Sequence, residues 1–347
     1  MTQSRYAAVV AEVRDAVSAR TVGLVAGVLL VQLAFIGSYV GAFHDPVPHQ
    51  IPVAVAGAHA TRTADGLVGL DGRPLDTSVT GSATEARRQV EHGDVAAALV
   101  ISGSSKHDTL YVASGGGVSL ATAVGEVVDK AEQSQGRSVA TTDLVPLAEG
   151  DARGLTGFYL VIGWLVGGYL VSSMLGIARG ARPATRGRAL VRLAALVPYA
   201  VLSGLGGALL VDPVMDALPG HFWALGGLGV LLVLSSATVT MALQVLFGAV
   251  GIGLTVLLFV VLGNPSAGGA YQGEMLPGLW RTIGPWLPNG AGTSSVRELV
   301  YLGGDVSGQL LVVTAYVVLG AVVALVAAPA TVGPRHAASR GSRAGQA

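Results

Sequence analysis

The most concentrated chemical groups in the chain are five arginines in one short segment, Arg179, Arg182, Arg186, Arg188 and Arg192. No acidic residue lies between the first and the last of them. Guanidinium groups bind carboxylates and phosphates through paired N–H donors, so a cluster of this kind suits an acidic partner surface or lipid headgroups. The default interpretation of such a cluster is that its positive charge keeps the loop on the cytoplasmic side of a membrane.

Phosphate-cleaving chemistry is not encoded in this sequence. A P-loop needs a glycine-rich turn that ends in Gly-Lys-Ser/Thr, because its backbone amides and its lysine hold the phosphates. The only two lysines, Lys106 and Lys130, follow Ser105 and Asp129 instead. Cysteine is absent, and no Gly-x-Ser-x-Gly elbow occurs. We therefore expect no enzyme activity and no cofactor.

One group of possible metal ligands stands near residue 45, where His44, Asp45 and His49 lie close in sequence. Pro46 and Pro48 stiffen the segment between them, and no further ligand is evident. We expect no metal site here. The chain as a whole has 21 basic and 21 acidic residues, which argues against nucleic acid as a partner.

Long stretches without charge dominate the remaining sequence. A membrane-spanning helix needs about 20 apolar residues to cross about 30 Å of hydrocarbon. The uncharged stretches provide room for six such helices, so we expect an α-helical polytopic membrane protein in the bilayer. The six expected spans are 22–43, 155–177, 190–211, 222–243, 245–263 and 309–330.

The charges that flank these spans predict their orientation. Residues 1–21, the loop after the second span and the tail at 331–347 together hold 11 basic and 2 acidic residues. Basic residues in short loops stay in the cytoplasm. We therefore expect a multi-pass protein of the cell membrane with both termini cytoplasmic. Residues 1–21 should form an amphipathic helix along the inner surface, and 331–347 a basic tail.

The exported segment at 44–154 has the alternating pattern of an α/β domain between the first and second spans. Ile51 to Gly57 suits a buried strand, and Ser82 with Glu85 predicts a capping box at the start of a helix. The expected element order is βαβαββαβ.

The second outward segment, 264–308, is rich in proline and amphipathic. It predicts two short helices broken at Gly284-Pro285 and Asn289-Gly290, with a second capping box at Ser295 and Glu298. Broken backbone at membrane depth is tolerated only where protein or a water-filled cavity covers it. The segment is therefore a candidate extracellular gate within the bundle 155–330. An alternative interpretation of equal weight is a pair of surface helices that rests on the lipid headgroups. The candidate gate residues are Trp280, Pro285, Trp286 and Pro288.

With these features in place, the chain resembles an ABC type-2 exporter permease. Three stretches, Ile51-Pro-Val-Ala-Val, Gly93-Asp-Val-Ala-Ala-Ala-Leu-Val-Ile and Asn264-Pro-Ser-Ala-Gly-Gly, resemble the YhgE/Pip (phage infection protein) group. The resemblance implies a separate ATPase subunit that docks on the loop after the second span, which is the five-arginine segment. It also implies a homodimer or a heterodimer.

Two functions remain open at this stage. The first is a permease that moves an amphipathic or hydrophobic molecule outward with the energy supplied by its ATPase partner. The second is a membrane scaffold or receptor that does not transport, whose exported domain binds a protein or an envelope component.

Overall fold

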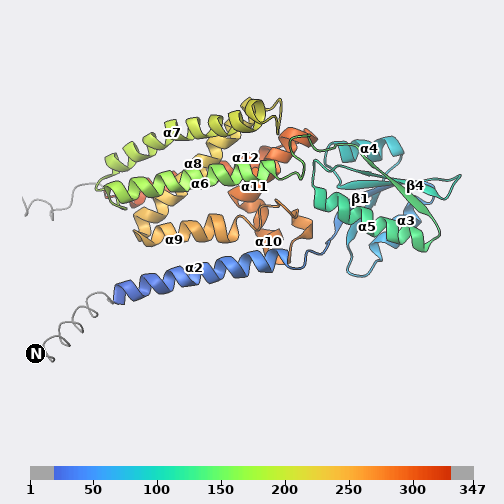
Figure 1. Cartoon of the computed structure of the whole chain (residues 1–347), viewed down its shortest axis with the longest axis horizontal. Helices are drawn as coiled ribbons and strands as arrows, with labels where there is room; N and C mark the ends of the chain where they lie inside the picture. The colour runs from blue at the N-terminus through green and yellow to red at the C-terminus, as the bar shows by residue number, and fades with distance from the viewer. Residues whose placement is uncertain (1–18, 330–347) are drawn as a thin grey trace, which may run out of the picture.

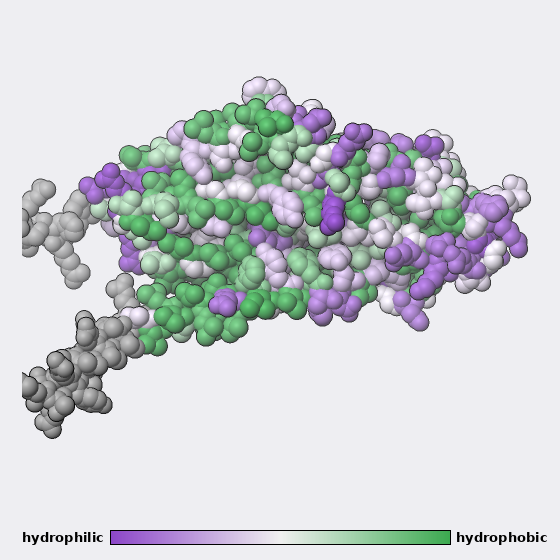
Figure 2. Space-filling model, viewed as in Figure 1, coloured by the Kyte–Doolittle hydropathy of each residue, from purple (hydrophilic) through white to green (hydrophobic). Residues whose placement is uncertain are grey.

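The computed structural model describes residues 19–329, with a helical bundle at one end and an α/β domain at the other (Figure 1). The predicted surface helix at 1–21, apart from its last residues, and the basic tail at 331–347 lie outside the described residues. Hydrophobic side chains cover most of the helical end, whereas hydrophilic ones gather on the α/β domain (Figure 2). This division is the surface expected of a protein that sits partly in a bilayer.

Five helices are long and apolar enough to cross a membrane. Each coincides with one of the expected spans. They are α2 (Ala19–Phe43), α6 (Thr156–Arg179), α7 (Arg186–Leu209), α8 (Phe222–Phe247) and α12 (Ser307–Ala327). Helix α8 lies at the centre of the bundle, where it packs against α6, α7 and α12.

The expected count of six spans is not confirmed, because the predicted span at 245–263 is shorter than its sequence suggested. Helix α8 continues to Phe247, and the chain then reverses at Gly248, which has a φ of +66°. Only α9 (Val250–Val256) and the π-helix η2 (Leu257–Leu262) remain for the return. At about 1.5 Å per residue, this piece is shorter than a bilayer core.

The α/β domain has the predicted element order. Its strands form one sheet in the order β2-β1-β3-β4-β5, in which only the β3–β4 pair is antiparallel. Helices α3 and α5 pack on one face of this sheet and α4 on the other. The elements are β1 (Ile51–Gly57), α3 (Ala60–Val68), β2 (Leu75–Val79), α4 (Ala83–Glu91), β3 (Ala97–Ile101), β4 (His107–Val112), α5 (Val118–Ser134) and β5 (Ser138–Asp143).

Half of the first capping box is confirmed, since Ser82 caps the helix while the Glu85 carboxylate accepts hydrogen bonds from Arg88 and Gln89. Ser82 is the N-cap of α4, and its Oγ accepts a 3.1 Å hydrogen bond from the amide of Glu85. Such a bond satisfies one of the free N–H groups at the start of a helix.

The proline-rich segment 264–308 folds back into the bundle. It contains short helices joined by tight turns. They are η3 (Gly273–Met275), α10 (Gly278–Ile283), η4 (Gly284–Trp286), α11 (Pro288–Arg297) and η5 (Glu298–Leu302). The predicted break at Gly284-Pro285 is present as the 3-10 turn η4.

Two details of this segment were predicted wrongly. The chain does not break at Asn289-Gly290, because Pro288 starts α11 and both residues lie within its first turn. Ser295 does not cap a helix, since its Oγ donates a 2.8 Å hydrogen bond to Ala291 O inside α11. Most of α11 is buried against α6, α8 and α12. A helix pair resting on headgroups therefore does not describe this segment.

Candidate functional site

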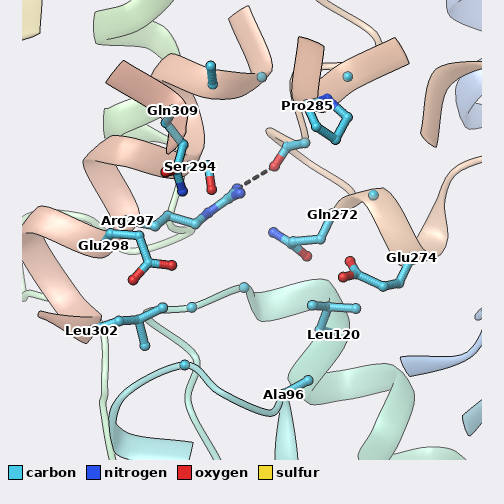
Figure 3. Close-up of a pocket in the computed structure, with 18 of the residues that line it drawn as sticks. Ala96, Leu120, Gln272, Glu274, Pro285, Ser294, Arg297, Glu298, Leu302 and Gln309 are labelled. Atoms are coloured by element: carbon cyan, nitrogen blue, oxygen red, sulfur yellow. Dashed lines mark hydrogen bonds between the residues drawn. The ribbon is translucent and has the colours of Figure 1, made fainter. Parts of the chain in front are cut away.

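A cavity of about 660 Å³ lies between the α/β domain and the segment 264–308 (Figure 3). One wall is a single face of α11, formed by Gly290, Ala291, Ser294 and Arg297, and Glu298 at the start of η5 continues it. These positions recur at the spacing of neighbouring turns in a helix. Because the first two residues are small, space remains beside the charged end of the helix.

The other walls come from elements far apart in the sequence. Loop 266–274, the turn η4 and the start of α12 belong to the bundle side. The α/β domain adds the start of β1, the end of α4 and the loop before α5. Gly116 and Gly117 line the domain side. A Cβ on Gly117 would overlap with the side chain of Gln272. Glycine here allows the two walls to approach each other.

The central polar group of the cavity is Arg297 (Figure 3). Its Nη2 donates hydrogen bonds to the carbonyl oxygens of Gly268 and Gly269, the latter at 3.1 Å. Within residues 19–329, no acidic side chain forms an ion pair with it. Burial lowers the pKa of Arg297 to about 10, although Glu274 and Asp151 favour its charged form. The guanidinium therefore carries a full positive charge at neutral pH.

Two carboxylates also line the cavity, Glu274 and Glu298. Burial raises the pKa of Glu298, while the amide of Gly304 bonds its carboxylate and acts in the opposite direction. Gln272 is held at the domain side by a hydrogen bond from the hydroxyl of Ser119. The arrangement offers one half-buried cation, flanking acids and amides, and largely apolar walls, but no nucleophile with an adjacent base.

The α/β domain is fixed to the cavity by several contacts. The hydroxyl of Tyr301 donates a 2.8 Å hydrogen bond to Asp151, which also accepts from the amide of Thr156 at 2.9 Å. The amide of His49 donates to Glu274 O at 2.8 Å. Met275 is part of the hydrophobic core of the domain. Both walls of the cavity are therefore joined directly to each other.

The candidate gate residues do not form one group. Pro285 and Trp286 line the cavity and are exposed, whereas Pro288 is buried at the start of α11. Trp280 packs against α2 instead, where its Nε1 donates a 3.0 Å hydrogen bond to Ser38 Oγ. Ser38 in turn donates to Val261 O at 2.5 Å. Trp280 thus connects α10 with α2 and η2.

The five-arginine segment lies at the end of the bundle opposite the α/β domain (Figure 1). Arg192 donates to Gly180 O at 2.9 Å and Arg179 O at 3.0 Å, and Arg182 donates to Leu246 O at 2.8 Å. Both side chains satisfy carbonyl groups where helices end.

The remaining side chains of the segment are exposed. In the described part of the chain, those of Arg179, Arg186 and Arg188 form no hydrogen bond or ion pair. These three guanidinium groups are therefore free to meet a partner.

Sequence reasoning did not identify Arg297, Gln272 or Glu274 as site residues. One signal was present, since Arg297 is the only charged residue in the stretch of small and polar residues that forms α11. The other two residues reach the cavity through loop geometry that no local pattern encodes.

No protein family model, no curated protein and no solved structure matches the chain. The fold defines a multi-pass membrane protein with an α/β domain, on the evidence of five apolar helices and one five-stranded sheet.

Proposed function

We propose that this chain is the membrane-spanning subunit of an ABC-type exporter, which moves an amphipathic or hydrophobic substrate outward with a separate ATPase subunit. One observation carries the proposal: α11, a short helix rich in small and polar residues, is buried among apolar helices and lines a cavity. Irregular backbone is stable at such a place when it lines a path or a binding site.

The contacts of α11 fit a fixed half-helix within a transport path. Asn289 Nδ2 donates to Phe259 O at 2.9 Å and to Asn264 Oδ1 at 2.8 Å. Phe259 belongs to the π-helix η2, where the backbone bonding is irregular. Gly292 lies against Leu232 and Val161, so a larger residue would push α11 away from the bundle. The start of the helix is therefore anchored, while its far end carries Arg297 toward the cavity.

Orientation follows from the same proposal. The five-arginine segment faces the cytoplasm together with both termini, and the α/β domain lies outside the cell membrane. The short helix α9 together with η2 is then the sixth membrane crossing. It is shorter than the other five, and neighbouring residues cover the rest of the distance across the bilayer. The functional unit is a homodimer or a heterodimer, which cross-linking in the membrane tests directly.

The exposed arginines form the proposed contact with the ATPase. Arg186 and Arg188 lie at the start of α7 with free side chains, and their charge suits an acidic groove. Arg192 is less suitable for a test because it bonds carbonyl groups at the end of α6. Its replacement would disturb the fold and the contact together.

The test is purification of the chain in mild detergent together with its bound proteins. We expect a nucleotide-hydrolysing subunit to copurify with the natural chain and to be lost from the double variant Arg186→Glu, Arg188→Glu. The matched control is Arg62→Glu with Arg153→Glu, which makes the same charge change on exposed residues at the other end of the molecule.

Two results would contradict the proposal. The first is retention of the ATPase by the Arg186, Arg188 variant, which would place the docking surface elsewhere. The second is the absence of any ATPase from the natural complex, with an envelope protein bound to the α/β domain instead. That second result would favour the scaffold or receptor function.

A further inference from the structure

We infer that the cavity binds the anionic head of a membrane amphiphile at Arg297 and admits its apolar tail from the side. The inference names the substrate class of the proposed function. It rests on that function only where it identifies the bound ligand as the transported substrate. The binding itself is a property of this chain alone.

Most of the N–H donors of Arg297 are unused. A guanidinium has five N–H donors, and it binds a carboxylate or phosphate best through two parallel bonds. Only Nη2 of Arg297 is engaged, and only by neutral carbonyl groups, so Nε and Nη1 have no partner among residues 19–329. Arg297 is half-buried, and a cation partly removed from water without an acidic partner is costly. An anionic ligand would supply that partner.

The acids around the cavity do not take this role. The carboxylate of Glu298 is bonded by the amide of Gly304, and burial raises its pKa. Glu274 is near enough to favour the charged form of Arg297 but makes no ion pair with it. A second arginine, Arg281, lines the same cavity. The free N–H donors of Arg297 and the guanidinium of Arg281 can therefore bind an anionic ligand.

The exit of the cavity indicates where the rest of the ligand lies. Two of its lining residues are among the most exposed apolar side chains of the molecule, Leu311 of α12 at 71% and Trp286 of η4 at 69%. Tryptophan is enriched where a membrane meets water. An opening bordered by such residues faces lipid rather than water, so the ligand enters sideways from the outer leaflet.

The size of the cavity fits this ligand. About 660 Å³ is within the range of pockets that enclose a drug-sized molecule. It has room for one head group and the first part of a chain, while the remainder of the tail stays between Leu311 and Trp286 in the lipid.

The experiment measures equilibrium binding of a labelled long-chain fatty acid to the purified full chain in mild detergent, without ATPase or nucleotide. Two further probes separate head from tail: inorganic phosphate, and an amphiphile of equal chain length with a trimethylammonium head. We expect saturable binding of the fatty acid alone. Arg297→Gln should weaken that binding about tenfold or more, because a charge-assisted pair of hydrogen bonds is lost.

The variants separate a role in binding from a role in folding. Arg297→Lys should retain part of the affinity, since it keeps the charge but not the paired donors. Arg153→Gln, an exposed arginine outside the cavity, is the matched control and should bind normally. Ser294→Phe fills part of the cavity while the guanidinium of Arg297 is retained, and it should also abolish binding. This variant keeps the test decisive if Arg297→Gln does not fold.

Several outcomes would overturn the inference. They are unchanged affinity in folded Arg297→Gln, unchanged affinity in Ser294→Phe, equal binding of the trimethylammonium amphiphile, and phosphate binding as tight as that of the fatty acid. The Arg186→Glu, Arg188→Glu variant should bind the fatty acid normally. Failure of ATPase docking and failure of ligand binding are therefore seen in separate measurements.

Discussion

The hydroxyl of Tyr301 donates a 2.8 Å hydrogen bond to Oδ2 of Asp151, although 150 residues separate the two in sequence. The other carboxylate oxygen of Asp151 accepts from the amide of Thr156 at the start of α6. Asp151 is buried, with 3% of its surface exposed. One carboxylate thus joins the end of η5 to the first turn of α6, directly beside the contact between the domain and the bundle.

Replacement of Tyr301 by phenylalanine tests this connection. The buried carboxylate of Asp151 would lose one donor, which costs about 1–2 kcal/mol. We expect a lower midpoint of thermal unfolding in detergent. Tyr159→Phe is the control, because the Tyr159 side chain is exposed, and it should leave the midpoint unchanged. Equal midpoints for both variants would show that the Tyr301 bond contributes nothing to stability.

The attachment of α10 to α2 depends on a glycine. A Cβ at Gly41 would lie 2.8 Å from Cη2 of Trp280, whereas a Cβ at Gly37 would meet nothing within 4 Å. Gly41→Val should displace the indole ring and break its hydrogen bond to Ser38, which shifts tryptophan fluorescence to longer wavelength. Gly37→Val, one turn earlier on the same helix, should leave the spectrum unchanged. Identical spectra for the two variants would contradict the proposed contact.

Close packing of α6 on α8 gives a second matched pair of glycine variants. A Cβ on Gly168 would overlap with Val233 O and Ser236 Oγ of α8, while a Cβ on Gly163 has open space. Gly168→Ala should therefore destabilise the bundle by about 1–3 kcal/mol through overpacking. Gly163→Ala should be neutral or slightly stabilising, because alanine favours helix more than glycine does. Thermal unfolding of both variants in the same detergent distinguishes them.

A buried acidic pair in the α/β domain predicts a dependence of stability on pH. Asp108 is buried and receives two 2.6 Å hydrogen bonds from Arg137, with another from the amide of Ser102. Burial opposes the ionisation of Asp108, but these bonds lower its pKa overall. Burial raises the pKa of the neighbouring Glu132, and the charge of Asp108 raises it further. Arg137 lies 3.4 Å from the carboxylate of Glu132 and acts in the opposite direction, but the pKa of Glu132 stays raised overall.

The sign of the effect follows from the raised pKa of Glu132. Its contribution to stability is complete below its unfolded pKa of about 4.3 and is lost as the pH rises through its folded pKa. Glu132→Gln mimics the protonated form and should flatten the fall of stability over this interval. Glu126→Gln, on the exposed side of the same helix, should keep the slope of the natural protein. Unfolding midpoints from pH 4 upward check the prediction, which an unchanged slope in Glu132→Gln would refute.

Elements whose causes are local could be predicted from composition and residue spacing. Uncharged apolar stretches specified five of the long helices, since burial of apolar side chains in lipid requires only length and composition. The order of strands and helices in the α/β domain followed from alternation and turn residues. The N-cap bond between Ser82 and Glu85 was found because the two residues lie three apart in sequence.

The position of segment 264–308 depends on long-range packing. Its composition allowed a helix pair on the membrane surface or a buried hairpin, and the choice depended on partners distant in sequence, such as Phe259 O for the side chain of Asn289. The same contacts left Arg297 beside a cavity with unused donors. Local patterns do not encode which carbonyl groups or carboxylates a side chain will meet, because those meetings depend on the packing of whole helices against the sheet. The chemistry of the site is therefore a product of long-range packing, whereas the membrane helices follow from composition.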